Sequence, residues 1–431
     1  MKRINIPVTL TWLVALFVTP LPFLVILTTT MQTVYAQTPS MPIKLGIVAY
    51  AWMLAAVYLA SRPRWLDRLT GLPAMYMIHG VLSVLAIAVS FLHQMRLPAE
   101  GLAKLSGSAS LHLFMLVAIW SLITMAGWLS TRVPVIGKLR RSVERAFRHE
   151  TNVWLHRLNL VAMALVVVHV HAIGFIYALK PFVLFFDVVT LVVALCVVRE
   201  KFSRRHRYSG RLEANAQIAP NVRQLTIRVP KLANGWQRGD FAFIRFPMIP
   251  GMKELHPFSM VNEPNREGLM RFAIRGDGDF TKALASVPAG TDGTGAQVEV
   301  SGPFGRYERF LQEHDPKRPV VVYAGGIGVT PLIPVAMSAA RDGRRVRFLY
   351  SAKTQQELLY ADDLRRWRKA TPNCELALRA GRFSDDELSA AKMDDAVYLI
   401  AGPSAMLRAI RLMLFRSGVR AGDICYEPFA W

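Results

Sequence analysis

Four histidines lie within apolar stretches of the N-terminal half of the chain, in two similarly spaced pairs: His79 with His93, and His156 with His169. At about 1.5 Å rise per residue, each pair spans roughly 20 Å along a helix. Ionisable side chains within long apolar segments are costly and are therefore functional candidates. Neutral imidazole is a good ligand for haem iron. Two histidines at one depth on two helices could hold one haem from both sides, and the four could hold two haem b groups.

The helices that must position these histidines belong to the apolar half of the chain. Of the 431 residues, 52% are hydrophobic, and almost all long apolar runs lie before residue 200. Runs of this length are typical of helices that cross a lipid bilayer. We predict an all-α bundle of six transmembrane helices at 8–29, 42–60, 73–95, 110–130, 153–177 and 181–198.

The first run allows two interpretations. Lys2 and Arg3 precede it and Val34-Tyr35-Ala36 follows it, as around a signal peptide and its cleavage site. The run is longer than the usual signal core, and Pro20 and Pro22 within it are better tolerated in membrane helices than in soluble ones. We expect a retained helix.

Basic residues are concentrated beside the apolar runs. The formal net charge is +22, and Arg and Lys cluster at 62–68, 132–148 and 199–211. This distribution marks cytoplasmic loops and does not indicate a nucleic-acid partner. We predict a multi-pass protein of the cell (inner) membrane with both termini in the cytoplasm.

This orientation assigns a depth to each histidine. The third and fifth predicted spans then run in the same direction, from the inside to the outside. His79 is expected level with His156 near the cytoplasmic face, and His93 level with His169 near the outer face.

The helical spacing does not decide which histidine is the second ligand of the outer haem. At about 100° per residue, a 14-residue step returns to within about 40° of its starting face, but a 13-residue step misses by about 140°. His171 would lie closer than His169 to the face of His156, and His112 is another rival near the outer end. A π-bulge or a kink would reconcile His169. Arg157 could pair with a haem propionate or anchor the helix at the inner surface.

The C-terminal half has two patterns. After a basic linker at 201–212, residues 213–315 form short alternating runs separated by Gly, Pro and Asn, which indicates an antiparallel barrel or sandwich, and we predict an antiparallel β-barrel. Residues 316–431 alternate strand and helix, which predicts an α/β doubly wound parallel sheet. With the bundle at 1–200, the chain is expected to be a multidomain membrane protein.

Other chemistries are not supported. The three cysteines, Cys196, Cys374 and Cys425, are scattered without a C-x-x-C motif, so an iron–sulfur or zinc site held by cysteines is not expected. No EF-hand or SH3-ligand segment is present, so no calcium switch and no obligatory protein partner is evident.

A Gly-rich turn connects the first strand and helix of the α/β region. It reads Ala324-Gly325-Gly326-Ile327-Gly328-Val329-Thr330-Pro331. Glycines let the backbone approach a pyrophosphate, and a helix N-terminus offers free N–H groups to it. The G-x-G-x-x-P form is weaker evidence than G-x-G-x-x-G, because glycines often only make a tight connection.

Several motifs together resemble a known family. The motifs are His256-Pro257-Phe258-Ser259, Arg275 to Thr281, Gly302 to Gly305, the Gly-rich turn, Ala401-Gly402-Pro403 and Glu427-Pro-Phe429. Their order resembles that of the ferredoxin–NADP reductase superfamily, and with the four-histidine half the whole resembles the bacterial NADPH oxidase and ferric reductase family.

The resemblance implies a role for each motif. His256, Pro257, Phe258 and Ser259 would line the FAD isoalloxazine and ribityl chain. FAD phosphates would be held by Arg275, Gly278 and Thr281. The nicotinamide cofactor would be held by Gly325, Gly326, Gly328 and Thr330 at its pyrophosphate, by Gly402 and Pro403 near the nicotinamide, and by Lys353 and Arg382 at an adenosine 2′-phosphate.

Lys353 and Arg382 favour NADPH as the nicotinamide cofactor, although NADH is possible. Phe429 or Trp431 would stack on the flavin and be displaced by nicotinamide, unless they only end a hydrophobic strand. Ala401 replaces a cysteine common in the family, which leaves the tuning of hydride transfer open.

The expected function is electron transfer across the membrane. Cytosolic NAD(P)H would reduce FAD, and electrons would pass through two bis-histidine haems to an acceptor outside. O2, giving superoxide, is the first expectation, and a ferric chelate is the alternative. A membrane-anchored flavin reductase without haem is a further alternative. A transporter is disfavoured because the spans show no inverted repeat.

Overall fold

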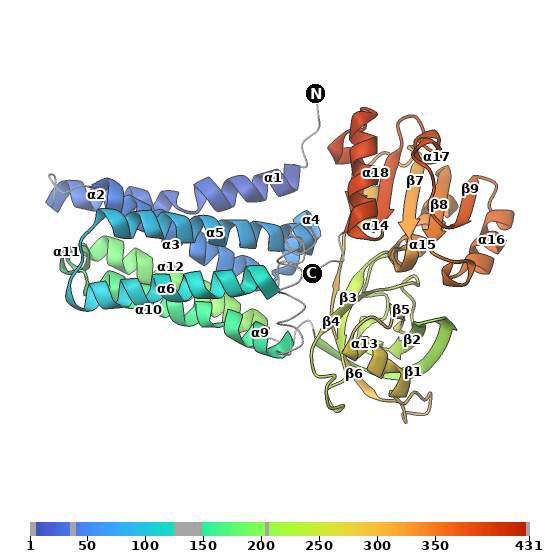
Figure 1. Ribbon diagram of the computed structural model, residues 1–431, viewed down its shortest axis with the longest axis horizontal. Helices are drawn as coiled ribbons and strands as arrows, with labels where there is room; N and C mark the ends of the chain where they lie inside the picture. Colours follow the sequence, from blue (N-terminus) through green and yellow to red (C-terminus); the bar gives the residue numbers. More distant parts are fainter. Residues whose placement is uncertain (1–5, 35–39, 125–148, 203–206, 428–431) are drawn as a thin grey trace. The chain divides into compact units, whose positions relative to one another are not determined.

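The computed structural model describes residues 6–34, 40–124, 149–202 and 207–427. Within these ranges the chain folds into a helical unit and a sheet unit, coloured along the sequence in Figure 1. The sheet unit also includes a short segment from the N-terminal half, Asp67–Gly71. Phe429, Trp431 and the basic loop at 132–148 lie outside the described residues.

The helical unit contains six helices long and apolar enough to cross a membrane, so this part of the prediction is confirmed. The fold within this unit is built from two tightly packed pairs, α3 along α5 and α6 along α10. The helices of the N-terminal half are α1 (Ile6–Leu13), a π-helical turn (Val14–Val18), α2 (Leu21–Val34), α3 (Ser40–Ala60), α4 (Arg64–Thr70), α5 (Leu72–Arg96), α6 (Gly101–Thr124), α9 (His149–His156), α10 (Leu158–Ala172), α11 (Gly174–Ala178) and α12 (Lys180–Phe202).

Two of the differences from the predicted helix boundaries have a clear physical reason. α6 begins at Gly101 instead of residue 110. Its first ten residues, GLAKLSGSAS, are too polar for an apolar-run criterion, but small residues allow close approach to α10. The fifth long helix ends at Ala172 instead of 177, because Ile173 has an extended backbone with φ −85° and ψ 101°.

The first sheet of the sheet unit is antiparallel and six-stranded, in the order β4-β3-β6-β1-β2-β5. The predicted closed barrel is wrong: between β4 and β5 the described residues form a single bridge, Met260 to Phe272. β4 is only four residues long and contains Pro257, which has no N–H to donate to a further strand. The strands are β1 (Arg207–Ala219), β2 (Val222–Arg228), β3 (Phe241–Arg245), β4 (His256–Ser259), β5 (Leu269–Arg275) and β6 (Gln297–Phe304).

The second sheet is parallel and five-stranded, in the order β11-β10-β7-β8-β9, and has the predicted alternation of strand and helix. The elements after β6 are α14 (Tyr307–Gln312), β7 (Val320–Gly325), α15 (Val329–Arg341), β8 (Val346–Ala352), α16 (Ala361–Ala370), β9 (Cys374–Ala380), α17 (Asp385–Ala390), β10 (Val397–Ala401), α18 (Ser404–Arg416) and β11 (Ile424–Tyr426).

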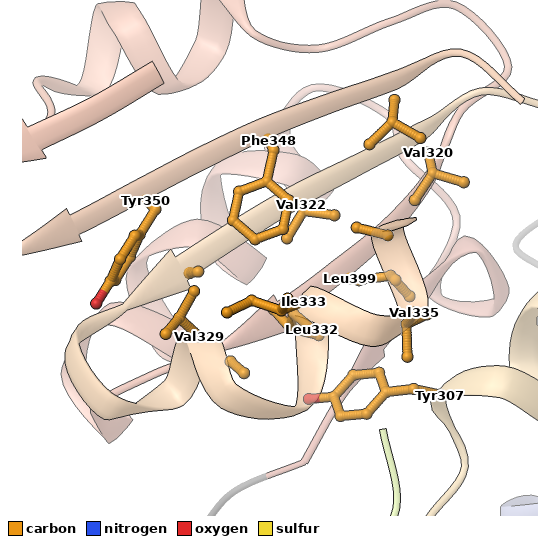
Figure 2. Packing of buried hydrophobic residues seen from close by; sticks show 14 of the residues in the cluster. Tyr307, Val320, Val322, Val329, Leu332, Ile333, Val335, Phe348, Tyr350 and Leu399 are labelled. Carbon is orange, nitrogen blue, oxygen red and sulfur yellow. The ribbon is translucent and has the colours of Figure 1, made fainter. Parts of the chain in front are cut away.

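The core of the second sheet explains its central strand. All six residues of β7 are buried, as expected for a parallel strand that is covered on both faces. Figure 2 shows Val322 and Phe348 of the sheet facing Leu332 and Ile333 of α15, with all four side chains buried.

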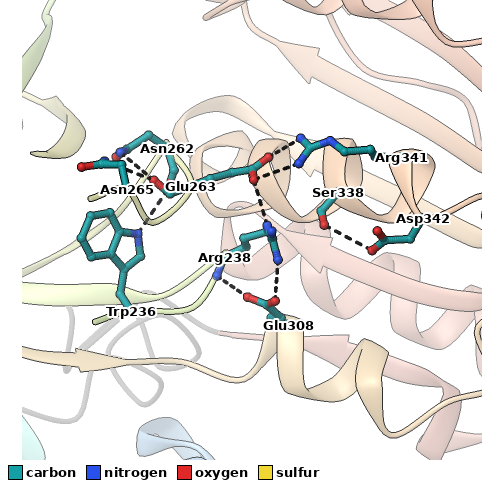
Figure 3. A network of polar contacts seen from close by, with 9 residues as sticks. All are labelled: Trp236, Arg238, Asn262, Glu263, Asn265, Glu308, Ser338, Arg341 and Asp342. Carbon is teal, nitrogen blue, oxygen red and sulfur yellow. Dashed lines mark hydrogen bonds and ion pairs between the residues drawn. The ribbon is translucent and has the colours of Figure 1, made fainter. Parts of the chain in front are cut away.

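Charged side chains join the two sheets within this unit. Glu263, in the loop after β4, accepts hydrogen bonds from Arg341 of α15 and from Arg238, at 2.5 and 3.1 Å respectively (Figure 3). Arg238 also contacts Glu308 of α14 at 2.7 Å. Burial raises the pKa of the Glu263 carboxyl, but the two arginines outweigh this effect and lower its pKa overall.

Arg68 of α4 inserts into the sheet unit as a buried cation. Its guanidinium makes two hydrogen bonds to the Asp240 carboxylate, at 2.8 and 2.9 Å, and a third to the carbonyl oxygen of Gly305 at 2.9 Å. The Asp240 side chain is only 2% exposed. A bidentate pair of this kind is among the stronger polar contacts in proteins, so Asp67–Gly71 is part of how this unit is stabilised.

We expect Arg68→Met to loosen the first sheet. The substitution keeps a long side chain but leaves the Asp240 carboxylate buried without this cation. Breaking a buried pair from one side costs about 3–5 kcal/mol. Because Arg68 is 20% exposed, we expect about 2–3 kcal/mol after solvent screening. Hydrogen exchange of the β3 amides, measured by mass spectrometry on the full-length protein, should accelerate roughly 30- to 100-fold.

The double variant Arg68→Met/Asp240→Asn is the control for this pair. A neutral amide needs no cation, so the double variant should exchange more slowly than Arg68→Met. Wild-type exchange rates in Arg68→Met would show that the pair contributes nothing to the sheet.

Candidate functional site

The helical unit brings the four predicted histidines together as two facing pairs. The ring centroids of His79 and His156 are 6.0 Å apart, and those of His93 and His169 are 6.2 Å apart. Each pair joins α5 to the α9–α10 helix. The two rings of each pair are close enough to bind one metal ion between them.

A neighbouring helix fixes each ring through Nδ1. The Nδ1 of His79 is 2.8 Å from the carbonyl oxygen of Ala56, and that of His93 is 2.9 Å from the carbonyl of Pro42, both on α3. Because a carbonyl oxygen only accepts, Nδ1 carries the proton in both rings and Nε2 keeps its lone pair.

The same arrangement recurs on the other side. The Nδ1 of His169 is 2.8 Å from the carbonyl of Ala103 on α6. The Nδ1 of His156 is 2.9 Å from the hydroxyl of Ser121, also on α6. Metal-binding histidines commonly donate their second nitrogen to such a partner. The carbonyl contacts leave Nε2 of His79, His93 and His169 available as metal ligands, and Nε2 of His156 is available when its Nδ1–H donates to Ser121.

The helix is irregular beside His156, which removes the spacing problem. α9 ends at His156 and α10 begins at Leu158, and the N–H of Arg157 contacts the carbonyls of both Val153 and Trp154. This local break turns the face of α10, so His169, 13 residues from His156, lies opposite His93.

The rival histidines have other partners. His171 contacts Asp187 of α12 at 3.3 Å through Nε2, and its Nδ1 bonds the carbonyl of Val167. His112 is exposed and bonds the Ser108 carbonyl of its own helix. Arg157 lies over the Trp154 ring at 5.9 Å, as an interfacial anchor would.

Two glycines make room for the outer rings. A Cβ at Gly46 would lie 2.9 Å from His93, and a Cβ at Gly107 would lie 2.7 Å from the Nδ1 of His169. Each glycine follows by four residues the carbonyl that its histidine bonds, Pro42 and Ala103 respectively. Because glycine has no side chain, the imidazole ring of each histidine has room to reach the carbonyl oxygen that it bonds.

In the sheet unit, the predicted flavin residues border one end of the first sheet. The rings of His256 and Phe258 of β4 both lie near the Phe280 ring, with centroids 4.1 and 6.1 Å away respectively. Pro257 lies between them, and Ser259 ends the strand as a buried residue. These half-buried, partly aromatic side chains suit a flat ring system.

The predicted flavin-phosphate residues follow β5. Arg275 is the last residue of β5 and pairs with Asp277 at 2.7 Å. The Thr281 hydroxyl accepts from the Gly278 N–H and donates to the Gly278 carbonyl, both at 2.9 Å. The turn before α13 (Asp279–Ala283) is thereby closed, with Arg275 beside it.

The predicted nucleotide residues gather at the carboxyl edge of the parallel sheet. Strand order reverses between β7 and β10, and such a switch point is where doubly wound sheets bind ligands. A Cβ at Gly328 would lie 2.6 Å from the backbone nitrogen of Gly402, which itself precedes Pro403. The turn after β7 and the turn after β10 therefore form one surface.

The remaining predicted residues border this surface. Gly326 has a positive φ of 54° with open space at its Cβ position. Gly325 packs against Met406, and the Thr330 hydroxyl bonds the Ile327 carbonyl at 3.0 Å. Lys353 and Arg382 are exposed just after β8 and β9.

The comparisons with known proteins agree with this arrangement. The FAD-binding domain family matches residues 209–308, and the oxidoreductase NAD-binding domain family matches residues 322–412. The chain carries an FAD- and NAD-binding oxidoreductase module.

Curated relatives resemble part of the chain. A flavohemoprotein of Schizosaccharomyces pombe is 26% identical over 150 residues, which cover 31% of this chain and 35% of that protein. The reductase component of propane 2-monooxygenase from Mycolicibacterium goodii is 27% identical over 240 residues, covering 49% of this chain and 65% of that protein. The chain thus spans between about a third and two thirds of these relatives.

A solved structure extends the likeness in fold. The flavohemoglobin from Malassezia yamatoensis, with bound FAD and haem, has a TM-score of 0.50 at 17% identity, covering 93% of this chain and 98% of that one. At this identity the likeness concerns the fold alone.

Glu427 is a buried carboxyl that sequence reasoning treated only as part of a motif. Its Oε1 accepts a hydrogen bond from the backbone N–H of Arg306 at 2.8 Å, and among the described residues its Oε2 has no hydrogen-bond partner. Burial raises the pKa of this carboxyl to about 8, and the nearby carboxylates of Asp67 and Asp240 add to the effect.

Other contributors were also missed. The carbonyls that hold the histidines carry no sequence signal, because every residue has one. Ser121, Gly46 and Gly107 are visible in the sequence, but only the packing of α3 on α5 and of α6 on α10 shows what they face.

We expect the oxidoreductase module to lose stability as the pH rises from about 6 to 9. The Glu427 carboxyl holds its proton up to about pH 8 when folded but releases it near 4.5 when unfolded. The folded state therefore binds more protons between these values, and stability falls as pH rises through the folded pKa. Thermal release of FAD fluorescence from the full-length protein should show this slope.

Glu427→Gln should flatten that slope, because an amide does not titrate. Glu375→Gln is the matched control: Glu375 is 61% exposed, and Arg347 lowers its pKa, so it should leave the slope between pH 6 and 9 unchanged. An unchanged slope in Glu427→Gln would assign the effect to another group.

Proposed function

We propose that this chain carries electrons across a membrane, from NAD(P)H and FAD on the cytoplasmic side to an acceptor outside, through two haem b groups held by the histidine pairs. His79 and His156 would hold the inner haem, and His93 and His169 the outer one. The oxidoreductase module would supply the electrons.

The observation that carries this proposal is the geometry of the pairs. Two metal–imidazole bonds of about 2.0–2.1 Å, added to the half-widths of two rings, span roughly 6 Å. The centroid distances are 6.0 and 6.2 Å. Haem iron needs only two axial ligands from the protein, so the absence of any cluster of three or more metal-binding side chains among the described residues is consistent with this geometry.

Bound haem would supply one-electron transfer at an iron with no open position. The protein's part is to orient four imidazoles and keep each Nε2 deprotonated through the contact at Nδ1. Because the iron would have no open coordination position, an acceptor would be reduced at the outer edge of the site and not at the iron itself. We propose O2 as the acceptor, giving superoxide, with a ferric chelate as the alternative.

The membrane placement rests on the six apolar helices and on charge. Helices of 20–25 residues suit the hydrocarbon core of a bilayer. The basic segments at 62–68 and 199–211 would face the cytoplasm, which puts both termini and the NAD(P)H site on that side. The protein would be a multi-pass protein of the cell membrane.

A second candidate follows from the names of the relatives. Two of them are called a reductase component and an electron transfer subunit, of propane 2-monooxygenase and of dihydroorotate dehydrogenase B respectively. The module could likewise reduce a separate cytosolic protein, with the helices as an anchor. An anchor has no use for four histidines held through Nδ1, so we favour the first function.

The deciding experiment is the visible spectrum of the full-length protein purified in detergent. About two haems per chain, reduced on addition of NADPH under anaerobic conditions, would support the proposal. A flavin spectrum without a Soret band would reject it in favour of the second candidate. Superoxide and ferric-chelate assays on the same sample would then identify the acceptor.

Gly107→Ala should remove the outer haem. The new Cβ would lie 2.7 Å from the Nδ1 of His169, closer than real Cβ contacts, so the ring would leave the Ala103 carbonyl and its ligand position. Haem content, measured as pyridine haemochrome, should fall from about two to about one per chain.

Gly80→Ala is the matched control for Gly107→Ala. Gly80 also lies within a histidine-bearing helix, but nothing stands within 4 Å of its Cβ position. This variant should keep both haems. Full haem content in Gly107→Ala would mean that His169 is not the outer ligand.

The substitutions Lys353→Ala and Arg382→Ala should weaken the binding of NADPH more than the binding of NADH. A charged hydrogen bond to the 2′-phosphate contributes about 1.5–3 kcal/mol, so KM for NADPH should rise roughly tenfold or more with ferricyanide as acceptor. Arg365→Gln on α16 is the control. Equal changes with NADPH and NADH would exclude a 2′-phosphate role.

A further inference from the structure

One of the four histidines is held by a different kind of group. His79, His93 and His169 each have Nδ1 next to a backbone carbonyl oxygen. His156 has Nδ1 next to the Ser121 hydroxyl, at 2.9 Å. The two carbonyl-held rings of the outer pair therefore have equivalent partners, whereas the rings of the inner pair do not.

The two kinds of partner differ in what they enforce. A carbonyl only accepts, so it fixes the proton on Nδ1 of the ring. It also strengthens the opposite nitrogen as an electron donor. A hydroxyl can accept or donate, and a neutral hydroxyl polarises the N–H less than a carbonyl does. For His156 to bind metal through Nε2, its Nδ1–H must donate to Ser121.

We propose that Ser121 is the positioning residue of His156, and that its weaker polarisation makes the inner haem iron the more easily reduced of the two. This inference rests on the proposed function. A stronger axial donor stabilises the oxidised iron, and second-shell hydrogen bonds are among the means by which proteins set haem potentials. The outer iron, with two carbonyl-polarised ligands, is then the more reducing one, at the side where the acceptor would bind.

The placement of Ser121 supports a role at the ring. It lies in the last turn of α6, and among the described residues its hydrogen bond joins α6 to the α9 end at His156. A second serine of α6, Ser110, makes the same kind of bridge: its hydroxyl donates to the Ala162 carbonyl of α10 at 2.9 Å. Ser110 bonds backbone, whereas Ser121 bonds an imidazole, so the two form a matched pair for comparison.

The test is a redox titration of the two haems in the full-length protein, followed by absorbance and by low-spin EPR. Ser121→Ala leaves the Nδ1–H of His156 without its acceptor, which weakens His156 as a donor. At a fixed applied potential, the reduced-to-oxidised ratio of one haem should rise several-fold, and one low-spin signal should broaden or shift. A tenfold change in the ratio corresponds to about 59 mV for one electron. The other haem should not change.

Two further variants complete the test. Ser121→Thr keeps the hydroxyl and should restore the wild-type potential and signal. Ser110→Ala removes a buried helix-bridging hydroxyl of the same helix and should alter neither haem. Unchanged titration and EPR signals in Ser121→Ala, with both haems bound, would overturn the inference. A wild-type protein without haem would instead reject the proposed function, so the two failures are distinguishable.

Discussion

The helical unit depends on one use of the backbone: carbonyl oxygens of α3 and α6 accept hydrogen bonds from the Nδ1–H groups of His79, His93 and His169. A helical carbonyl keeps a lone pair beyond its own helix bond, so α3 and α6 can hold rings without losing their own structure. The polar rings are thereby satisfied within an apolar bundle, where an unmet N–H would be costly. This contact requires α3 to pack tightly on α5 and α6 on α10, and the two glycines of the outer pair keep those distances short.

In the oxidoreductase module, charged side chains hold the two sheets together. Its two sheets must hold a flavin and a nicotinamide in fixed register, although they fold as separate layers. Glu263 accepts hydrogen bonds from Arg238, in the turn before β3, and from Arg341 of α15. Arg238 also pairs with Glu308 of α14, so two carboxylates join the parts of this module. Gly328 and Gly402 allow two turns at the switch point to touch, which leaves backbone N–H groups of both turns on one surface.

Much of the fold could be predicted because its signals are local. Apolar length identified the helices, and the alternation of strand and helix identified the parallel sheet. The start of α6 was missed, because Gly and Ser reduce apolarity while favouring close packing. Closure of the first sheet was wrongly expected, because alternating runs do not reveal whether the last strands pair. The pairing of the histidines could be predicted from spacing and loop charge, whereas the groups that hold them could not, since carbonyls are present at every residue and only tertiary packing selects among them.

The membership of Asp67–Gly71 in the sheet unit limits how far the two halves of the chain are modular. A reductase fragment cut at the start of β1 would lack Arg68, and Asp240 would keep its burial but lose its guanidinium. If these helices were fused to a reductase from another protein, Arg68 would lack the Asp240 carboxylate as its partner. A fragment meant to keep this ion pair would therefore have to include Asp67–Gly71 together with the sheets.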